Sequence, residues 1–440
     1  MGKVSLNKNL FLHIKRNHLD FISLLVLITL PNGSVPLKAL GLLIIFTLGL
    51  GRILHFRMNK IAWYYVGMMV LTMGSFAYYL YHQIPYYLIG LAMVLFTWLL
   101  CLLAHVQIWG GLRRYGIEVA ERSLIWYFYL LLIISTVQII GNGGIQFTGA
   151  EGDNVKAIFT FSTDNSLVMG IYSFFFLRRQ KYIHAFLALF VMLSTGSMTS
   201  VLMWIITFCA YFILLHRGSG KILSLTKRFL ILASVIFLAA FLSWDNVLYT
   251  RNILWKFRFF SNPETLPRKA IAYLQGFSYS FEDPKTLFLG AGAANYSSRA
   301  AFVMGGEYVG WYPQHLSYKS EDFSKGPFSL WNPRVVTFMY TDGTANQPFS
   351  FYLQLLTEYG LIGVFLFLLL YIGFLYRKRH LLSPESMCII ILILFSLSIE
   401  YWFEYLSLMV IFEWMILTEI YTFQKEKLSR ADSSPMNRNS

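Results

Sequence analysis

The sequence predicts an all-α protein that crosses a membrane about twelve times and carries one long segment on its outer side. Apolar residues make up 56% of the 440 residues and charged residues only 13%, whereas soluble proteins carry roughly 25% charged residues. Apolar runs long enough to span a bilayer follow one another along the chain. Most basic residues lie in every second connection between these runs, as expected of cytoplasmic loops.

Each apolar run of about 20 residues gives one predicted span. The runs lie at 19–36, 37–55, 61–82, 85–106, 123–141, 157–177, 182–198, 199–216 and 228–245, and then at 347–376, 385–400 and 403–423. The chain is therefore expected to divide into spans 1–9 (1–246), a long outer segment (247–346), spans 10–12 (347–424) and a polar, disordered tail (425–440).

The distribution of Lys and Arg predicts the orientation of the chain. With both termini in the cytoplasm, the cytoplasmic segments hold 24 of the 36 Lys and Arg residues, and the short outer connections hold only Lys38 and Lys156. Short cytoplasmic loops are enriched in these residues. The net charge of +14 thus follows from topology and does not indicate nucleic-acid binding.

The outer segment, 247–346, is where we expect the function to lie. It contains ten basic and seven acidic residues, and guanidinium groups bind phosphate oxygens in a two-point contact. A pyrophosphate at the membrane surface would suit its arginines, and the alternative is that they are solvated loop charges; they are Arg251, Arg258, Arg268, Arg299 and Arg334. A helix is expected at 267–281, where Arg268 precedes apolar residues at helical spacing.

Aromatic residues in the same segment alternate with polar ones, as in sugar-binding sites. Tyr296 and Trp311 are candidates for sugar contacts, although an aromatic belt at the lipid headgroups would also explain them. Candidates for a general base can be named only by residue type; they are His315, Glu307, Asp342 and Asp322. No motif has metal-ligand spacing, so no metal or cofactor is expected.

Polar residues inside predicted spans are costly and often functional. Asp164 lies in the sixth span between Thr163 and Asn165, and it is a candidate for substrate binding. Glu413 lies in the twelfth span, whereas Glu400 and Glu404 are also explained by a position in an outer turn. The run Leu289–Tyr296 is rich in glycine, which favours a tight turn rather than a dinucleotide site, because no βαβ pattern surrounds it.

Three stretches resemble the bacterial O-antigen polymerase and ligase superfamily, membrane glycosyltransferases of the Wzy and WaaL type. Residues 194–200 (STGSMTS) stand where that family often has a Ser-Gly-Ser-Arg turn, although Met198 takes the place of the Arg. The others are 268–296, with its Arg, aromatic helix, Pro and Gly-x-Gly, and 352–363 (YLQLLTEYGLIG). Ligases place a His before the Leu-Gln run, where this chain has Phe349-Ser350, so the resemblance implies a polymerase.

The resemblance also implies a GT-C-like architecture, a place in the bacterial inner membrane and a metal-independent reaction without cofactor. The substrates would be oligosaccharides on undecaprenyl pyrophosphate, joined on the periplasmic face, and a partner could be a chain-length-regulating membrane protein. Arg268, helped by Arg299, Arg258 or Arg334, would stabilise the leaving pyrophosphate. The alternatives are an O-antigen ligase, a flippase for lipid-linked oligosaccharides, and a membrane scaffold without enzymatic activity.

Overall fold

The computed structural model describes residues 58–84, 86–142, 155–159, 161–216, 251, 255, 266–310, 312–331 and 348–433. All regular elements in these ranges are helices, as the sequence predicts. Four stretches are long and apolar enough to cross a membrane: α3 (Lys60–Tyr81), α4 (Leu88–Tyr115), α5 (Ile117–Gly141) and Phe351–Leu381. The total of about twelve spans stays a prediction, and its segments 19–36, 37–55 and 228–245 lie outside the described residues.

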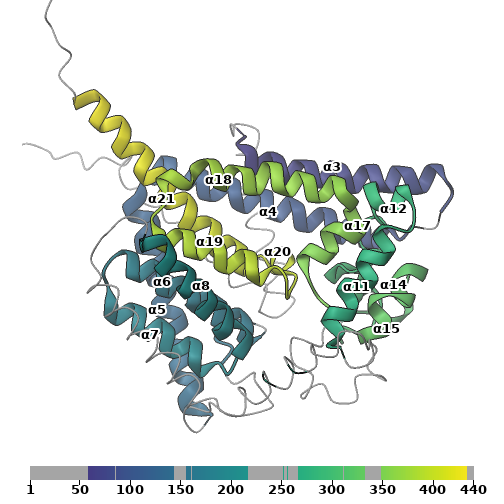
Figure 1. Ribbon diagram of the computed structural model, residues 1–440, viewed down its shortest axis with the longest axis horizontal. Coiled ribbons are helices and arrows are strands. Elements are labelled where there is room, and N and C mark those ends of the chain that lie inside the picture. The colour runs from purple at the N-terminus through teal and green to yellow at the C-terminus, as the bar shows by residue number, and fades with distance from the viewer. Residues whose placement is uncertain are drawn as a thin grey trace, which may run out of the picture.

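Five further helices overlap predicted spans, and the last of them continues to Ser433, into the tail that the sequence predicts to be disordered. They are α6 (Ser162–Arg178), α7 (Tyr182–Ser194), α8 (Met198–His216), α19 (Pro384–Ser396) and α21 (Ser407–Ser433). Local sequence sets where they begin: Ser383 accepts a hydrogen bond from Ser386 N, and Pro384 occupies the first helical position of α19, where its missing N–H costs nothing. α6 packs on α7, α8, α19 and α21, and Figure 1 shows α5 to α8 grouped together.

Aromatic rings fill the space between α3, α4, the turn at Phe367–Ile372 and the short helix at Trp402–Tyr405. The ring of Tyr64 lies 5.9 Å from that of Trp98, 5.7 Å from Phe367 and 6.2 Å from Phe403. Such edge-to-face and tilted pairs add about 0.5–1.5 kcal/mol each beyond the burial of their area. Part of the high aromatic content therefore builds the core instead of a headgroup belt.

The predicted span 347–376 is not one straight helix. Within α17 (Phe351–Leu366), Gly360 has the non-helical angles φ 60° and ψ −163°. The rings of Phe351 and Phe367 lie 5.4 Å apart, although 16 residues of straight helix would separate them by about 24 Å. The chain therefore reverses at Gly360, and residues 361–366 continue through a π-helical turn at Phe367–Ile372 into α18 (Gly373–Lys378). Hydropathy missed this reversal because it carries no information about chain direction.

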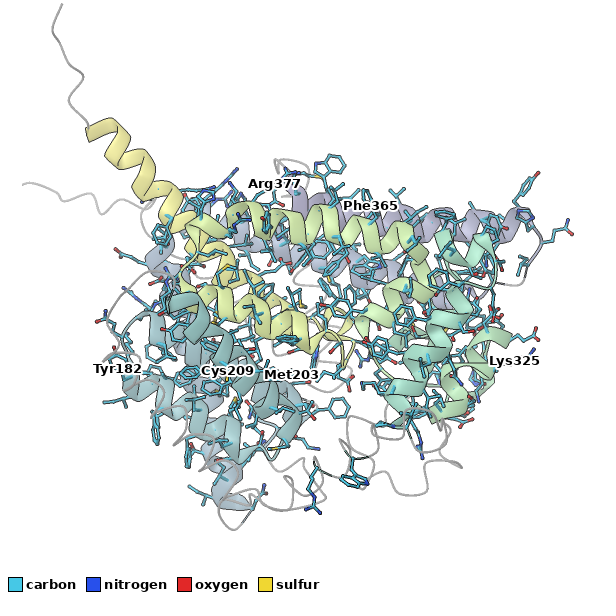
Figure 2. The ribbon with its side chains drawn as sticks, in the orientation of Figure 1. Tyr182, Met203, Cys209, Lys325, Phe365 and Arg377 are labelled. Atoms are coloured by element: carbon cyan, nitrogen blue, oxygen red, sulfur yellow. The ribbon has the colours of Figure 1, made fainter. Side chains whose placement is uncertain are left out.

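The described part of the outer segment forms short helices gathered at one end of the molecule (Figure 1). They are α11 (Arg268–Ser280), α12 (Pro284–Leu289), α13 (Arg299–Met304), α14 (Glu321–Lys325) and α15 (Pro327–Trp331), with a 3₁₀ turn at Gln314–Leu316. Lys325 marks this end in Figure 2, and Arg377 and Tyr182 lie toward the other. The helix predicted at 267–281 is confirmed as α11.

α11 packs through its small residues. Ala272, Gly276 and Ser280 are buried, and a Cβ on Gly276 would lie only 2.2 Å from Leu353 Cδ1 of α17. Leu274 and Phe277, which the apolar pattern would place inward, are 46% and 49% exposed. Close approach through small residues is how helices pack within membranes, so α11 resembles a membrane-associated helix more than one from a soluble domain.

Candidate functional site

The outer segment is fastened to α17 by one buried carboxylate. Glu358 is 0% exposed, and its oxygens accept the backbone N–H groups of Ala294, Tyr296 and Ser298 at 2.8–2.9 Å. Hydrogen bonds to an ionised group are roughly twice as strong as neutral ones. The segment 294–298 is therefore held in one conformation, and with it the start of α13, because Ser298 is the N-cap of that helix.

Glycines make this close contact possible. Ala291 N donates to Thr357 O at 2.7 Å and Gly292 N donates to Glu358 O at 3.1 Å. Gly290 and Gly292 have φ of 72° and 82°, and a Cβ on Gly290 would lie 2.4 Å from the carbonyl carbon of Glu358. The glycine-rich run is thus a tight turn, as predicted, and it lies directly against the break in α17.

Lys269 joins α11 to the connection between α19 and α21. Its Nζ donates to Phe349 O at 2.6 Å and to Ile399 O at 2.5 Å, and its side chain is buried. Tyr273, one turn later, lies 2.5 Å from Ser350 Oγ and donates to Ser398 O at 2.8 Å. The first two turns of α11, which begins at Arg268, are therefore fixed beside residues 397–406.

Two carboxylates of this connection face the outer segment. The backbone N–H of Arg299 donates to the carboxylate of Glu404, and the guanidinium charge acts on both Glu404 and Glu400. Gln354 Nε2 of α17 donates to Glu404 Oε1 at 2.7 Å. Glu404 lies in the short helix α20 (Trp402–Tyr405), before α21 begins at Ser407. We call Lys269, Arg299, Gln354, Glu400 and Glu404 the junction cluster.

Burial controls the protonation of the junction cluster. It raises the pKa of Glu404 to about 8, with the charge of Glu358 acting in the same direction and Arg299 opposing it. Burial also raises the pKa of Glu400 and lowers that of Lys269, and each of these two charges favours the ionised form of the other. A carboxyl group with a pKa near 8 can accept and release a proton near neutral pH.

Two of the residues predicted to be catalytic, Arg268 and Arg299, belong to this region. Both are partly buried, and each is the first residue of its helix, α11 and α13. Sequence reasoning did not select Lys269, Gln354 or Glu358. The available signals were the lysine beside Arg268 and the acidic pair Glu400 and Glu404, which an outer turn explained equally well.

Other predicted site residues lie elsewhere. His315 is exposed in the 3₁₀ turn, and Glu307 is exposed and paired with Lys319 at 2.7 Å. Asp322 accepts a hydrogen bond from Tyr279 at 2.8 Å. Tyr296 is only 2% exposed, and its ring stacks on that of Tyr279, so its ring face is not open to a sugar. Four predicted residues lie outside the described residues: Arg258, Trp311, Arg334 and Asp342.

Asp164 lies in the first turn of α6, which packs on α7, α8, α19 and α21. Its neighbour Asn165 donates to Ser135 Oγ and Val155 O at 3.2 and 3.1 Å. These bonds tie α6 to α5 and to residues 155–159, so Asn165 serves packing, and the role predicted for Asp164 stays a prediction.

Glu413 is the centre of a second polar cluster, inside the helices. Its Oε1 accepts from Tyr65 and, at 2.9 Å, from Tyr371, and its Oε2 lies 2.7 Å from His105 Nδ1. His105 Nε2 lies 3.0 Å from Asn59 Oδ1. Both carboxylate oxygens therefore have protein partners, which makes Glu413 a link between α3, α4, α21 and the π-helical turn.

Among the residues that the structure describes, no group of three or more His, Cys, Asp and Glu side chains is arranged to hold a metal ion. Comparisons with protein-family models, curated proteins and solved structures found no match for this chain. A functional interpretation therefore rests on the junction cluster and on the resemblance noted for residues 194–200, 268–296 and 352–363.

Proposed function

We propose that this protein is a polysaccharide polymerase of the bacterial inner membrane that joins oligosaccharide units carried on undecaprenyl pyrophosphate. The observation that carries the proposal is the junction cluster, in which buried carboxylates and basic side chains meet where the outer segment contacts the broken helix α17. A reaction at a lipid-linked sugar needs such a place, because the polyprenyl tail stays in the bilayer while the sugar is polar.

In the proposed reaction, a hydroxyl group of the acceptor sugar attacks the anomeric carbon of the donor chain. The bond from that carbon to the pyrophosphate breaks, and the pyrophosphate leaves with the electron pair. Arg268 and Arg299 stabilise the charge that develops on it, which is typically the largest single contribution to such catalysis. Fixing both arginines at the starts of anchored helices lowers the cost of arranging them during the reaction.

Phe349 and Ser350, at the position of the ligase histidine, favour a polymerase over a ligase. Phe349 is 3% exposed and packs on Tyr401 at 4.8 Å between ring centroids. Ser350 caps α17 by accepting from Leu353 N. Phe349 serves packing and Ser350 serves helix capping. The chain therefore lacks, at this position, the base that the resemblance to ligases would require.

The test is to incubate the purified protein with a lipid-pyrophosphate-linked oligosaccharide and to separate the products by size. A ladder of longer lipid-linked products, unchanged by a metal chelator, supports the proposal. Transfer to a lipid A core acceptor without a ladder would instead favour a ligase. Movement of the lipid across a vesicle membrane without turnover would favour a flippase, and neither turnover nor movement would favour a scaffold.

A further inference from the structure

Two buried oxygen atoms of the junction cluster point to a ligand that donates hydrogen bonds. Gln354 Oε1 and Glu400 Oε2 are buried and have no hydrogen-bond partner among the described residues, and the two residues are 1% and 8% exposed. Buried polar atoms are almost always paired. The amide oxygen of Gln354, whose nitrogen faces Glu404, and the ionised carboxylate of Glu400 are acceptors, so the complementary group carries hydrogen-bond donors, such as the hydroxyl groups of a sugar.

Of the three glutamates Glu358, Glu400 and Glu404, only one can serve such a ligand as a base. Glu358 is fully enclosed, and its oxygens are occupied by backbone N–H groups. Glu400 is paired electrostatically with Lys269, the largest influence on its carboxyl besides burial. Glu404 remains partly exposed, so a substrate can reach it, and Gln354 holds its Oε1 at 2.7 Å.

We propose that Glu404 is the general base of the reaction, that Gln354 is its positioning residue, and that the buried, unpaired oxygens of Gln354 and Glu400 receive hydroxyl groups of the acceptor sugar. This inference rests on the proposed function. The acceptor O–H bond breaks and its proton passes to a carboxylate oxygen of Glu404, while the oxygen forms the bond to the anomeric carbon. The pyrophosphate leaves with its electron pair, and Glu404 later returns the proton to water.

Several groups around Glu404 affect its charge. Arg299 of α13 favours the carboxylate, and Glu358 of α17 opposes it. Tyr359 of α17, Cys101 of α4 and Glu400 in the same connection are the other titratable groups nearby, and the first two interact with Glu404 electrostatically. The hydrogen bond from Gln354 lowers the pKa of Glu404, so losing that bond raises the pKa and shifts activity to higher pH.

The first experiment measures a single turnover of chain extension in wild type, Glu404→Gln and the control Glu321→Gln. Glu321 is exposed on α14 and paired only with Lys325 in the described chain. A wild-type ladder shows that the proposed function holds. The inference expects Glu404→Gln to slow extension by about 100-fold or more, as loss of a general base does, with the control unchanged. Extension by Glu404→Gln within about threefold of wild type overturns the inference while leaving the function standing.

The pH profile is a second, independent measurement. The single-turnover rate of wild type should rise with pH through an inflection near 8, because only the carboxylate accepts the proton. Gln354→Leu should move that inflection to higher pH, which a purely structural role would not do. A wild-type profile that is flat between about pH 6 and pH 9 overturns the inference, and it does so even if Glu404→Gln fails to fold.

Discussion

At the residue scale, Glu358 shows how one side chain can fix a whole segment. Replacing it by Gln keeps the shape but removes the charge, and the new NH₂ group must face a backbone N–H donor. We expect Glu358→Gln to lower the free energy of unfolding by roughly 1.5–3 kcal/mol and to expose the segment 290–298 to protease. Limited proteolysis and thermal unfolding in detergent measure both effects, with Glu321→Gln as the matched control, since its carboxylate lies on the surface.

Arg268 is the arginine that we propose contacts the leaving pyrophosphate. If it contacts the developing charge on the pyrophosphate, Arg268→Ala should reduce chain extension by about 10²–10³, with normal protein level and membrane insertion. Arg268→Lys should recover only part of the rate, because Lys keeps the charge but not the planar two-point contact. Lys325→Ala, which removes an exposed cation of the same segment, should have no effect. Polymer of normal length and amount from Arg268→Ala would show that this arginine is structural.

At the scale of elements, the reversal in α17 depends on Gly360. Its φ of 60° with ψ of −163° is a region that only glycine enters readily, and an added Cβ would lie 2.4 Å from the carbonyl carbon of Phe288. Gly360→Ala should therefore destabilise the protein by about 1–3 kcal/mol or more. Gly110→Ala is the control, because Gly110 is helical and has no atom within 4 Å of its Cβ position, so alanine should be neutral or slightly stabilising.

Thermal unfolding of both glycine variants, followed in detergent by size-exclusion chromatography, measures this difference. Equal stability of Gly360→Ala and Gly110→Ala would mean that α17 can straighten without loss. A straight α17 would carry Phe351 away from Phe367 and would separate Gln354 from Glu404, so chain extension should fall together with stability.

The helices show what the sequence can predict and what it cannot. Among the described residues, hydropathy predicted helices that overlap α3 to α8, α17, α19 and α21, because each contains an apolar run, although α4 and α21 end nine and ten residues beyond the predicted spans. It could not reveal the reversal at Gly360 or the packing of α11 through Ala272 and Gly276, which depend on contacts between distant segments. For the same reason, residue type pointed to Arg268 and Arg299, whereas Glu404 was named only as a polar residue that an outer turn would also explain, because the role proposed for it depends on neighbours from other elements.

At the scale of the whole molecule, the chain is expected to place the outer segment in the periplasm and Arg377 in the cytoplasm. Single cysteines introduced at Lys325 and Arg377, toward opposite ends of the molecule in Figure 2, test this. The natural Cys209 must first be replaced, since it is exposed, whereas Cys101 and Cys388 are buried. An impermeant thiol reagent added to spheroplasts should label position 325 but not 377, and the reverse pattern would show that the predicted orientation is inverted.

The fastening of residues 290–298 to α17 limits how such a protein can be recombined. The bonds run from backbone groups of one stretch to the carboxylate and carbonyls of the other, and Gly290 and Gly360 each leave no space for a side chain. An outer segment transplanted from another membrane protein would therefore lack the residues of α17 that fit against it. The smallest exchangeable module is the pair 290–298 and 357–360 taken together, so chimaeras of the outer segment should keep both stretches from one parent.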